Sequence, residues 1–271
     1  MTAGCRCVRM APHSPSATPP TQQSDAMASQ ELLPHAPINE AILDVRVSAR
    51  RDLKVEDFLE HSGPLKDHFP ERLERRGFQF SSEIEVGRSG EARTTDLGVQ
   101  GYFFKSADGL DIAQFRIDGF TLNRLRPYQS WDAWFPLFVR TWAHYVEVAR
   151  PARATRIAAR CINHIPLPLR GVLQDYLSNP PKVPPQLPNV MSSFVTSVAL
   201  WKSDDPALGV NLTQALEPQE GGNQRLVIDV DAFRTGDLGT NELLTHFEEL
   251  HQLRDHAFFE SITDAAKDLF K

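Results

Sequence analysis

Apolar and polar residues alternate along several short segments of this chain. The segment from Ala41 to Ala49 alternates between apolar and charged residues, and the segment from Phe78 to Val86 repeats the pattern. Successive side chains of a strand point to opposite faces, so this alternation predicts strands with one buried face. The strands expected in the first part of the chain cover residues 41–49, 78–86, 101–105 and 110–125.

A second pattern places apolar residues three and four positions apart, which is the spacing of one helix face. Phe135, Phe138, Trp142 and Val146 follow it. A helical stretch from Leu53 to Arg76 is also expected, broken by its prolines. The expected helices cover residues 53–76, 131–149, 169–177 and 241–270, and the remaining strands cover 156–165, 191–201, 208–216 and 225–230.

The expected elements occur in the order β-α-β-β-β-α twice, once in residues 31–150 and again in residues 151–271. Consecutive antiparallel strands closed by a helix predict an α+β fold. We therefore expect two halves, each an antiparallel sheet backed by a long helix. This arrangement resembles the TATA-binding-protein-like and helix-grip folds.

Residues 1–30 precede the first periodic segment and are rich in Pro, Ser, Thr and Gln. Such a composition buries too little apolar surface to offset the entropy of ordering, so it predicts a disordered tail. Met27 is a plausible alternative start. We expect that removing residues 1–30 leaves the melting temperature unchanged, and a large decrease on truncation would contradict this.

The net charge and the cysteine content of the chain limit its possible functional classes and cellular location. The chain has 271 residues, a net charge of −6 and three cysteines. The acidic balance argues against a general nucleic-acid binder or a binder of anionic membranes. No apolar run is long enough to span a bilayer. Without a disulfide framework, a reducing cytoplasm is the expected location.

No familiar catalytic or cofactor motif occurs, so the sequence predicts no catalytic residue, no cofactor and no metal site. Asp229 and Asp231 share a strand face and suit Mg²⁺, but a local salt bridge explains them as well. Cys161 and His164 should point to opposite faces of their strand, which favours a buried, inert thiol.

The strongest candidate site is a charged surface on the strand over residues 110–125. Between Ile112 and Arg170 there are nine arginines and no lysine. Arginine favours forked recognition of carboxylate or phosphate groups. Arg116 and Arg124 are expected on one strand face, where each should form charge-assisted contacts instead of extending into solvent. The alternative is that these arginines pair with the acidic C-terminal helix, within the chain or across a dimer. The candidate binding residues are Arg116, Asp118, Asn123, Arg124, Tyr128 and Arg160.

Five phrases carry a family resemblance: Leu33–Val47, Gly101–Gly109, Gln114–Tyr128, Arg156–Pro168 and Leu226–Asp231. Together they resemble a sporadically distributed bacterial family with LPxxPIxEA, QFxxDGFxxNRLxPY and RxIN motifs. The likeness runs from about residue 32 to the end. One departure is Cys161, where the family more often has an aromatic residue. The resemblance implies no particular activity, although patchy distribution is typical of defence and toxin-related genes.

Two functional hypotheses follow. The first is a non-enzymatic intracellular binding or assembly module, linked to a defence or toxin system, that acts with a protein partner or as a homodimer. The second is an enzyme or sensor for a small phosphorylated or nucleotide ligand held in an arginine-rich groove. A pocket lined by the candidate arginines favours the ligand, whereas arginines that are all paired to carboxylates favour the binding module.

Overall fold

The computed structural model describes residues 33–83, 91–168, 172–188, 190–218, 224–240 and 242–271. Residues Leu32–Lys271 form one compact unit. The predicted tail over residues 1–30 lies outside the described residues. None of the helices in the described part of the chain is long and apolar enough to cross a membrane.

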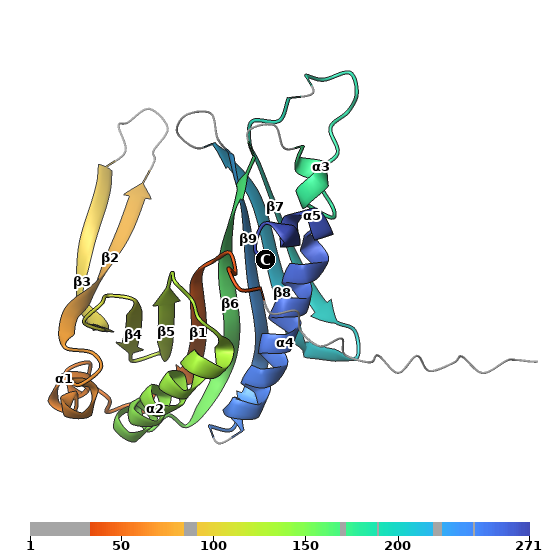
Figure 1. The fold of residues 1–271 in the computed structure, drawn as a ribbon. Helices are drawn as coiled ribbons and strands as arrows, with labels where there is room; N and C mark the ends of the chain where they lie inside the picture. Colours follow the sequence, from red (N-terminus) through yellow and green to blue (C-terminus); the bar gives the residue numbers. More distant parts are fainter. Residues whose placement is uncertain (1–32, 84–90, 169–171, 189, 219–223, 241) are drawn as a thin grey trace, which may run out of the picture. The chain divides into compact units, whose positions relative to one another are not determined.

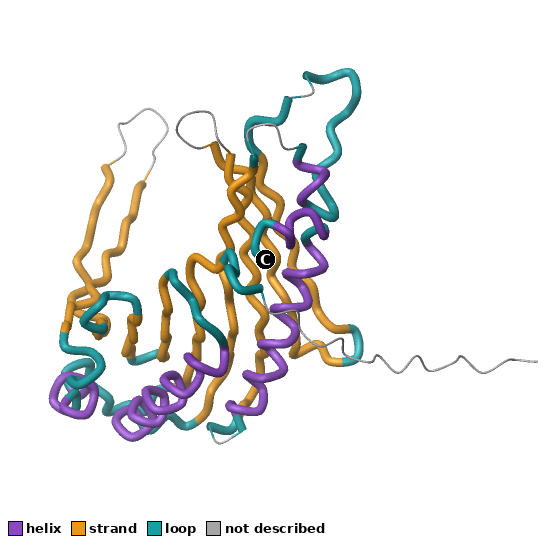
Figure 2. Tube along the Cα trace, in the orientation of Figure 1, coloured by secondary structure: helices purple, strands orange, loops and turns teal. Residues whose placement is uncertain are grey.

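In the described residues, nine antiparallel strands form a single sheet in the order β2-β3-β4-β5-β1-β6-β9-β8-β7. The strands are β1 (Ile38–Ser48), β2 (Glu71–Glu83), β3 (Glu91–Lys105), β4 (Asp111–Arg116), β5 (Gly119–Leu125), β6 (Arg153–Leu167), β7 (Phe194–Lys202), β8 (Asp205–Pro218) and β9 (Gln224–Leu238). The helices are α1 (Asp57–Glu60), a 3-10 turn η1 (Gly63–Leu65), α2 (Trp131–Ala149), α3 (Leu173–Tyr176), α4 (Leu243–Ser261) and α5 (Asp264–Asp268). Figure 2 shows the sheet and helices in the same orientation as Figure 1.

The prediction of two separate sheets, each backed by its own long helix, is wrong. Strand β1 pairs with β5 on one side and with β6 on the other, so the sheet is continuous through its centre. Alternating Ala41, Leu43 and Val45 give β1 one fully buried face. A strand left at an edge would expose a row of unpaired backbone groups. Pairing both edges of β1 avoids that cost.

One face of the sheet carries the core. On this face Phe120 of β5 packs against Phe138 of α2, with ring centroids 5.7 Å apart. Phe138 in turn meets Phe247 of α4 edge-on, at 4.7 Å between ring centroids. The two long helices therefore share one face of the sheet and one core (Figure 1). The opposite face is called the helix-free face below.

Two predicted elements differ from the structure for local reasons. The helix expected over residues 53–76 is reduced to α1 and η1, and β2 already begins at Glu71. Pro64 and Pro70 interrupt helical hydrogen bonding here. The strand expected over residues 110–125 is a hairpin of β4 and β5, which reverses at Ile117–Asp118.

The C-terminal helix expected over residues 241–270 is also divided. Helix α4 ends at Ser261, and Thr263 caps α5 by accepting a hydrogen bond from the backbone N–H of Ala266 at 3.3 Å. The backbone N–H of Ser178 donates to the carbonyl of Ser261 at 3.0 Å. Ile262 bridges to Leu177, next to α3. The end of the chain therefore packs on this same chain.

Candidate functional site

The helix-free face carries a row of charged side chains that begins at Asp44 on β1. Its carboxylate accepts hydrogen bonds from Arg116 at 3.1 Å and from the Thr121 hydroxyl at 2.6 Å. Arg46 donates to it at 3.1 Å, and Arg156 lies 3.9 Å away. Thr121 is the cross-strand neighbour of Asp44 in the register of β1 and β5. Strand pairing therefore assembles this group from residues far apart in sequence.

The row continues across the sheet. Arg156 on β6 donates to Asp231 on β9 at 2.7 Å, and Asn211 on β8 donates to the same carboxylate at 3.1 Å. We call Arg116, Thr121, Asp44, Arg156, Asp231 and Asn211 the cross-sheet network. It spans six adjacent strands, from β4 to β8. Neighbouring members of opposite charge attract one another, which stabilises their strand pairs.

A second row on the same face contains two more of the predicted residues. Asn123 donates to Glu40 at 2.6 Å and accepts from Gln114 at 3.0 Å. Arg160 binds Asp229 through two hydrogen bonds, of which the one from Nε is 2.7 Å long. This hydrogen bonding raises the pKa of Arg160. Arg160 is thus a fixed partner of Asp229.

The predicted binding residues divide between the two faces of the sheet. Arg116, Asn123 and Arg160 belong to the helix-free face, and Asp118 lies in the turn beside them. Arg124 pairs in register with Ala41, whose side chain lies on the helix-covered face. The expectation that Arg116 and Arg124 share a strand face is therefore wrong, because they lie on different strands of a hairpin.

Arg124 nevertheless makes charge-assisted contacts, as does Arg116, and this prediction is confirmed. Arg124 donates to Asp111 at 3.0 Å and to the carbonyl of Pro127 at 3.3 Å. His68 contacts the same oxygen of Asp111 at 3.0 Å. Asp111 is buried, so its charge needs these partners. Arg124 therefore serves mainly to compensate Asp111.

Tyr128 belongs to a buried polar cluster beneath α4. Burial raises the pKa of its hydroxyl, which has no hydrogen-bond partner among the described residues, while nearby Arg254 acts in the opposite direction. Arg254 is also buried and donates to Asp255 at 2.7 Å and to Nδ1 of His251 at 2.7 Å. The His251 ring stacks on Trp131 at 4.2 Å between centroids. The Tyr128 ring meets Trp134 edge-on, with ring centroids 6.0 Å apart, and is packed against the core.

The contact between Arg254 and His251 predicts a pH dependence of stability. Burial, and then the charge of Arg254, lowers the pKa of His251 despite nearby Asp255, Glu248 and Asp132. The folded state therefore binds fewer protons than the unfolded state, in which the pKa of His is about 6.5. Stability should be full above that pH and should decrease as the pH falls.

This prediction is tested with His251→Gln, whose amide oxygen still accepts from Arg254 but does not titrate. Denaturant unfolding between pH 8 and pH 5 should show a weaker acid loss for the variant than for the wild type. The pKa of His164 is also lowered by burial, and this residue is unchanged in both proteins. Identical pH profiles would contradict the role given to His251.

The acidic partners of the basic region differ from those expected. The alternative drawn from the sequence was that the arginines pair with acidic residues of the C-terminal helix. In the structure Asp229 and Asp231 lie on β9, and Asp44 lies on β1. Asp229 and Asp231 are therefore salt-bridged. Within the described residues there is no group of His, Cys, Asp and Glu side chains that could hold a metal ion. Cys161 is buried, which confirms that part of the expectation, and burial raises the pKa of its thiol to about 11.

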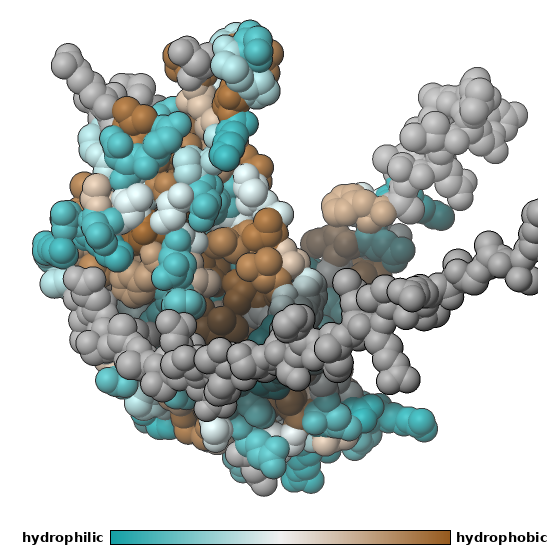
Figure 3. Space-filling view, turned by 90° about the vertical axis from the view of Figure 1, so that its right-hand side faces the viewer, coloured by the Kyte–Doolittle hydropathy of each residue, from teal (hydrophilic) through white to brown (hydrophobic). Residues whose placement is uncertain are grey.

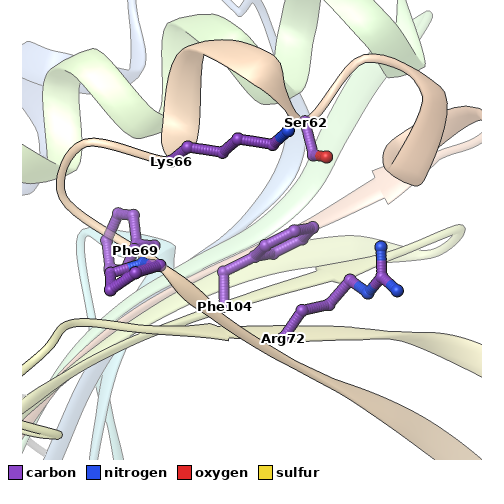
Figure 4. A pocket seen from close by; sticks show the side chains of 6 residues that line it. Ser62, Lys66, Phe69, Arg72 and Phe104 are labelled. Atoms are coloured by element: carbon purple, nitrogen blue, oxygen red, sulfur yellow. The ribbon is translucent and has the colours of Figure 1, made fainter.

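A cavity of about 250 Å³ lies between η1 and the start of β2, lined by Ser62, Lys66, Phe69, Pro70, Arg72 and Phe104. Phe69 and Phe104 are buried and form its apolar wall. Figure 4 shows the side chains of Lys66 and Arg72 on either side of the Phe104 ring. Within the described part of the chain, neither cation has an ion-pair partner. None of the six predicted binding residues lines this cavity.

A second open feature is β7, which forms one edge of the sheet (Figure 1). Helix α4 packs on β6, β9 and β8. Beyond this cover, every residue of β7 after Phe194 is exposed. Val195 is 74% exposed, and Leu200 and Trp201 are each 55% exposed. Figure 3 turns the right-hand side of Figure 1 toward the viewer and shows hydrophobic surface there.

The sequence predicted the strand over residues 191–201 but not its place at an edge. One signal was available, because residues 191–201 contain no charged side chain. The other edge strand, β2, includes Glu71, Arg72, Glu74, Arg75 and Arg76. Charged residues commonly protect an edge strand from pairing with another chain. Edge β2 has this protection over residues 71–76, whereas edge β7 has only Lys202, at its end.

No known protein family model matches the chain, and no curated protein sequence matches it significantly.

Proposed function

We propose that this protein is a non-catalytic binding module that joins a partner protein through the outer edge of β7, which pairs with no strand in the described part of the chain. The exposure of β7, with apolar side chains pointing to both faces, is the observation that carries the proposal. An extended segment added to such an edge gains main-chain hydrogen bonds, while the alternate side chains provide specificity. The buried, free Cys161 fits an assembly in the reducing cytoplasm.

The charged face supports this function because its arginines are already neutralised. Arg116 is bound by Asp44 and Asp118, and Arg160 is bound by Asp229. An anionic ligand would have to displace these carboxylates, each of which would lose its partner. We therefore assign Arg116, Asn123 and Arg160 a structural role that keeps the sheet rigid and its edge in register.

A photo-crosslinking scan in the host cell tests this function. A photoreactive benzophenone side chain is placed singly at Val195 or Ser197 on β7, and at the exposed Gln79 on β2 as the matched control. We expect crosslinked product from the β7 positions and none from β2. Equal product from both edges, or none from β7, would contradict the proposal. Because the family that the chain resembles has the patchy distribution of defence and toxin-related genes, proteins encoded in such operons are the first partners to test.

A second candidate function is the sensing of a small anion, and the cavity beside η1 is the observation that favours it. Lys66 and Arg72 supply positive charge, and Phe104 supplies an aromatic wall. These groups suit a phosphate or carboxylate carried on a small planar apolar group. This site does not include Arg116, Arg124 or Arg160, the arginines of the predicted groove.

Phenyl phosphate is a suitable probe of this cavity, with binding followed by NMR chemical shifts. We expect shifts at Phe104 that weaken in Lys66→Gln and in Arg72→Gln. Arg51→Gln serves as the control, because Arg51 is an exposed arginine outside the cavity. Equal shifts in all three variants would mean that the anion binds nonspecifically.

A further inference from the structure

We propose that the partner seated on β7 is a second copy of this chain. The two β7 strands would pair antiparallel about a two-fold axis at Val198, the central residue of the strand. This inference rests on the proposed function of β7 as a binding edge. It adds the identity of the partner and the register of the pairing.

Strand geometry fixes which side chains meet. On the helix-free face, Val195 of one copy would lie opposite Trp201 of the other, and Ser197 opposite Ala199. Trp201 already contacts Phe233 edge-on, with ring centroids 5.8 Å apart, which orients it on this face. The small residues Ser197 and Ala199 meet near the two-fold axis, and the larger apolar residues Val195 and Trp201 meet farther from it. The side chains of the two β7 strands are therefore complementary on this face.

The helix-covered face gives a similar result. Val198 would meet Val198 of the second copy at the axis, and Leu200 would lie opposite Thr196. Val198 is 40% exposed and Leu200 is 55% exposed in the single chain. An axis perpendicular to the sheet keeps the helices of both copies on the same side. The result would be one continuous sheet across the two copies.

Charge favours the antiparallel direction. Lys202 ends β7, whereas residues 191–201 have no charge. Parallel pairing would bring the two Lys202 side chains together. Antiparallel pairing places Lys202 of each copy opposite Phe194 of the other and separates the two lysines by about 27 Å, at a rise of ~3.4 Å per residue. Like charges are thus kept apart.

The charged opposite edge limits the assembly to two copies. Pairing of β7 with β2 of another copy would be heterologous and would generate an open filament. Strand β2 carries Glu71, Arg72, Glu74, Arg75 and Arg76, which would have no counterparts on apolar β7. Self-pairing of β7 uses up the apolar edge of both copies. We therefore infer a closed dimer.

Sedimentation of the full chain tests the stoichiometry. One pair of edge strands is a small interface, so a dissociation constant in the micromolar range is expected. Wild-type protein should move from 30.5 kDa toward twice that mass as its concentration rises. Val198→Lys places two cations together at the axis and should remain monomeric. Phe80→Lys, at a 78% exposed residue of β2, should dimerise as the wild type does.

Cysteine crosslinking tests the register and does not depend on the behaviour of the lysine variant. Directly opposed strand residues have Cα atoms ~4.5–5.5 Å apart, within disulfide range. In a background with Cys5→Ser and Cys7→Ser, Val198→Cys should form a covalent dimer on oxidation. Leu200→Cys is the control, because the two copies of that residue would lie about 14 Å apart.

The sedimentation and crosslinking results together decide whether β7 binds a second copy of this chain. A wild type that stays monomeric at all concentrations overturns the dimer. A dimer that crosslinks at residue 200 or at neither position overturns the β7 register. A β7 crosslink in the host cell to a protein other than this chain overturns the second copy but supports β7 as a binding edge. Loss of both dimer and host-cell crosslink overturns the proposed function as well.

Discussion

Replacing Asp44 with alanine is expected to reduce the free energy of unfolding by about 3–5 kcal/mol, the usual cost of breaking a buried ion pair. Asp44 accepts from Arg116 and Thr121 and lies beside Arg156. The side chain of Arg116 is 7% exposed, so water does not easily replace the lost carboxylate. Denaturant unfolding followed by circular dichroism measures the change.

Asp237→Ala is the matched control for Asp44→Ala. Asp237 pairs with Arg153 at 3.0 Å, but their side chains are 69% and 52% exposed. Water screens such a surface pair, so a loss below about 1 kcal/mol is expected. If the two alanine variants lose equal stability, the cross-sheet network does not support the sheet as described.

The double variant Phe258→Asp with Ile262→Asp is expected to unfold the chain. Phe258 is 8% exposed and Ile262 is 3% exposed, and both lie in the core. Burying two unpaired carboxylates costs several kcal/mol each, which approaches the ~5–15 kcal/mol that separates folded from unfolded domains. Far-ultraviolet circular dichroism and thermal melting should both show the loss of structure.

Leu244→Asp is the control for this double variant. Leu244 lies on the same helix α4 but is 36% exposed, so the new carboxylate can reach water. We expect a change within about 0.5 kcal/mol, which is typical of surface substitutions. A folded double variant with an unchanged melting temperature would contradict the packing of the C-terminal segment on this chain.

Local periodicity predicted those elements that have one buried face. The expected helix over residues 131–149 coincides with α2, because its apolar side chains face the sheet at regular intervals. The strand expected over residues 41–49 overlaps β1 for the same reason. The first half of β3, from Glu91 to Gln100, was missed. Its described side chains up to Leu97 are exposed, so no buried face imposes an alternation on the sequence.

The sheet order was not predictable from these patterns. Pairing of β1 with β6 joins segments more than a hundred residues apart, and neither segment identifies its neighbour. One turn does carry a local signal, because Asp118-Gly119 is a typical hairpin dipeptide and lies between β4 and β5. This turn places Arg116 and Arg124 on different strands.

The candidate site was predicted as a set of charged residues without its partners. Charge-assisted contacts for Arg116 and Arg124 were expected and are present. The carboxylates that receive them come from β1, from β4 and from the turn between β4 and β5, and their roles depend on strand register. The absence of charge over residues 191–201 is visible in the sequence, but it identifies an open edge only once β7 is known to be the last strand.

Hydrogen–deuterium exchange along β7 at two protein concentrations tests the binding edge most directly. Alternate amides of an edge strand face solvent and exchange rapidly unless another strand covers them. We predict that amides between Phe194 and Lys202 become protected as the concentration rises, and that Val198→Lys abolishes this change. Amides of β7 that exchange at the same rate at both concentrations, or protection that arises on β2 instead, would contradict pairing through β7.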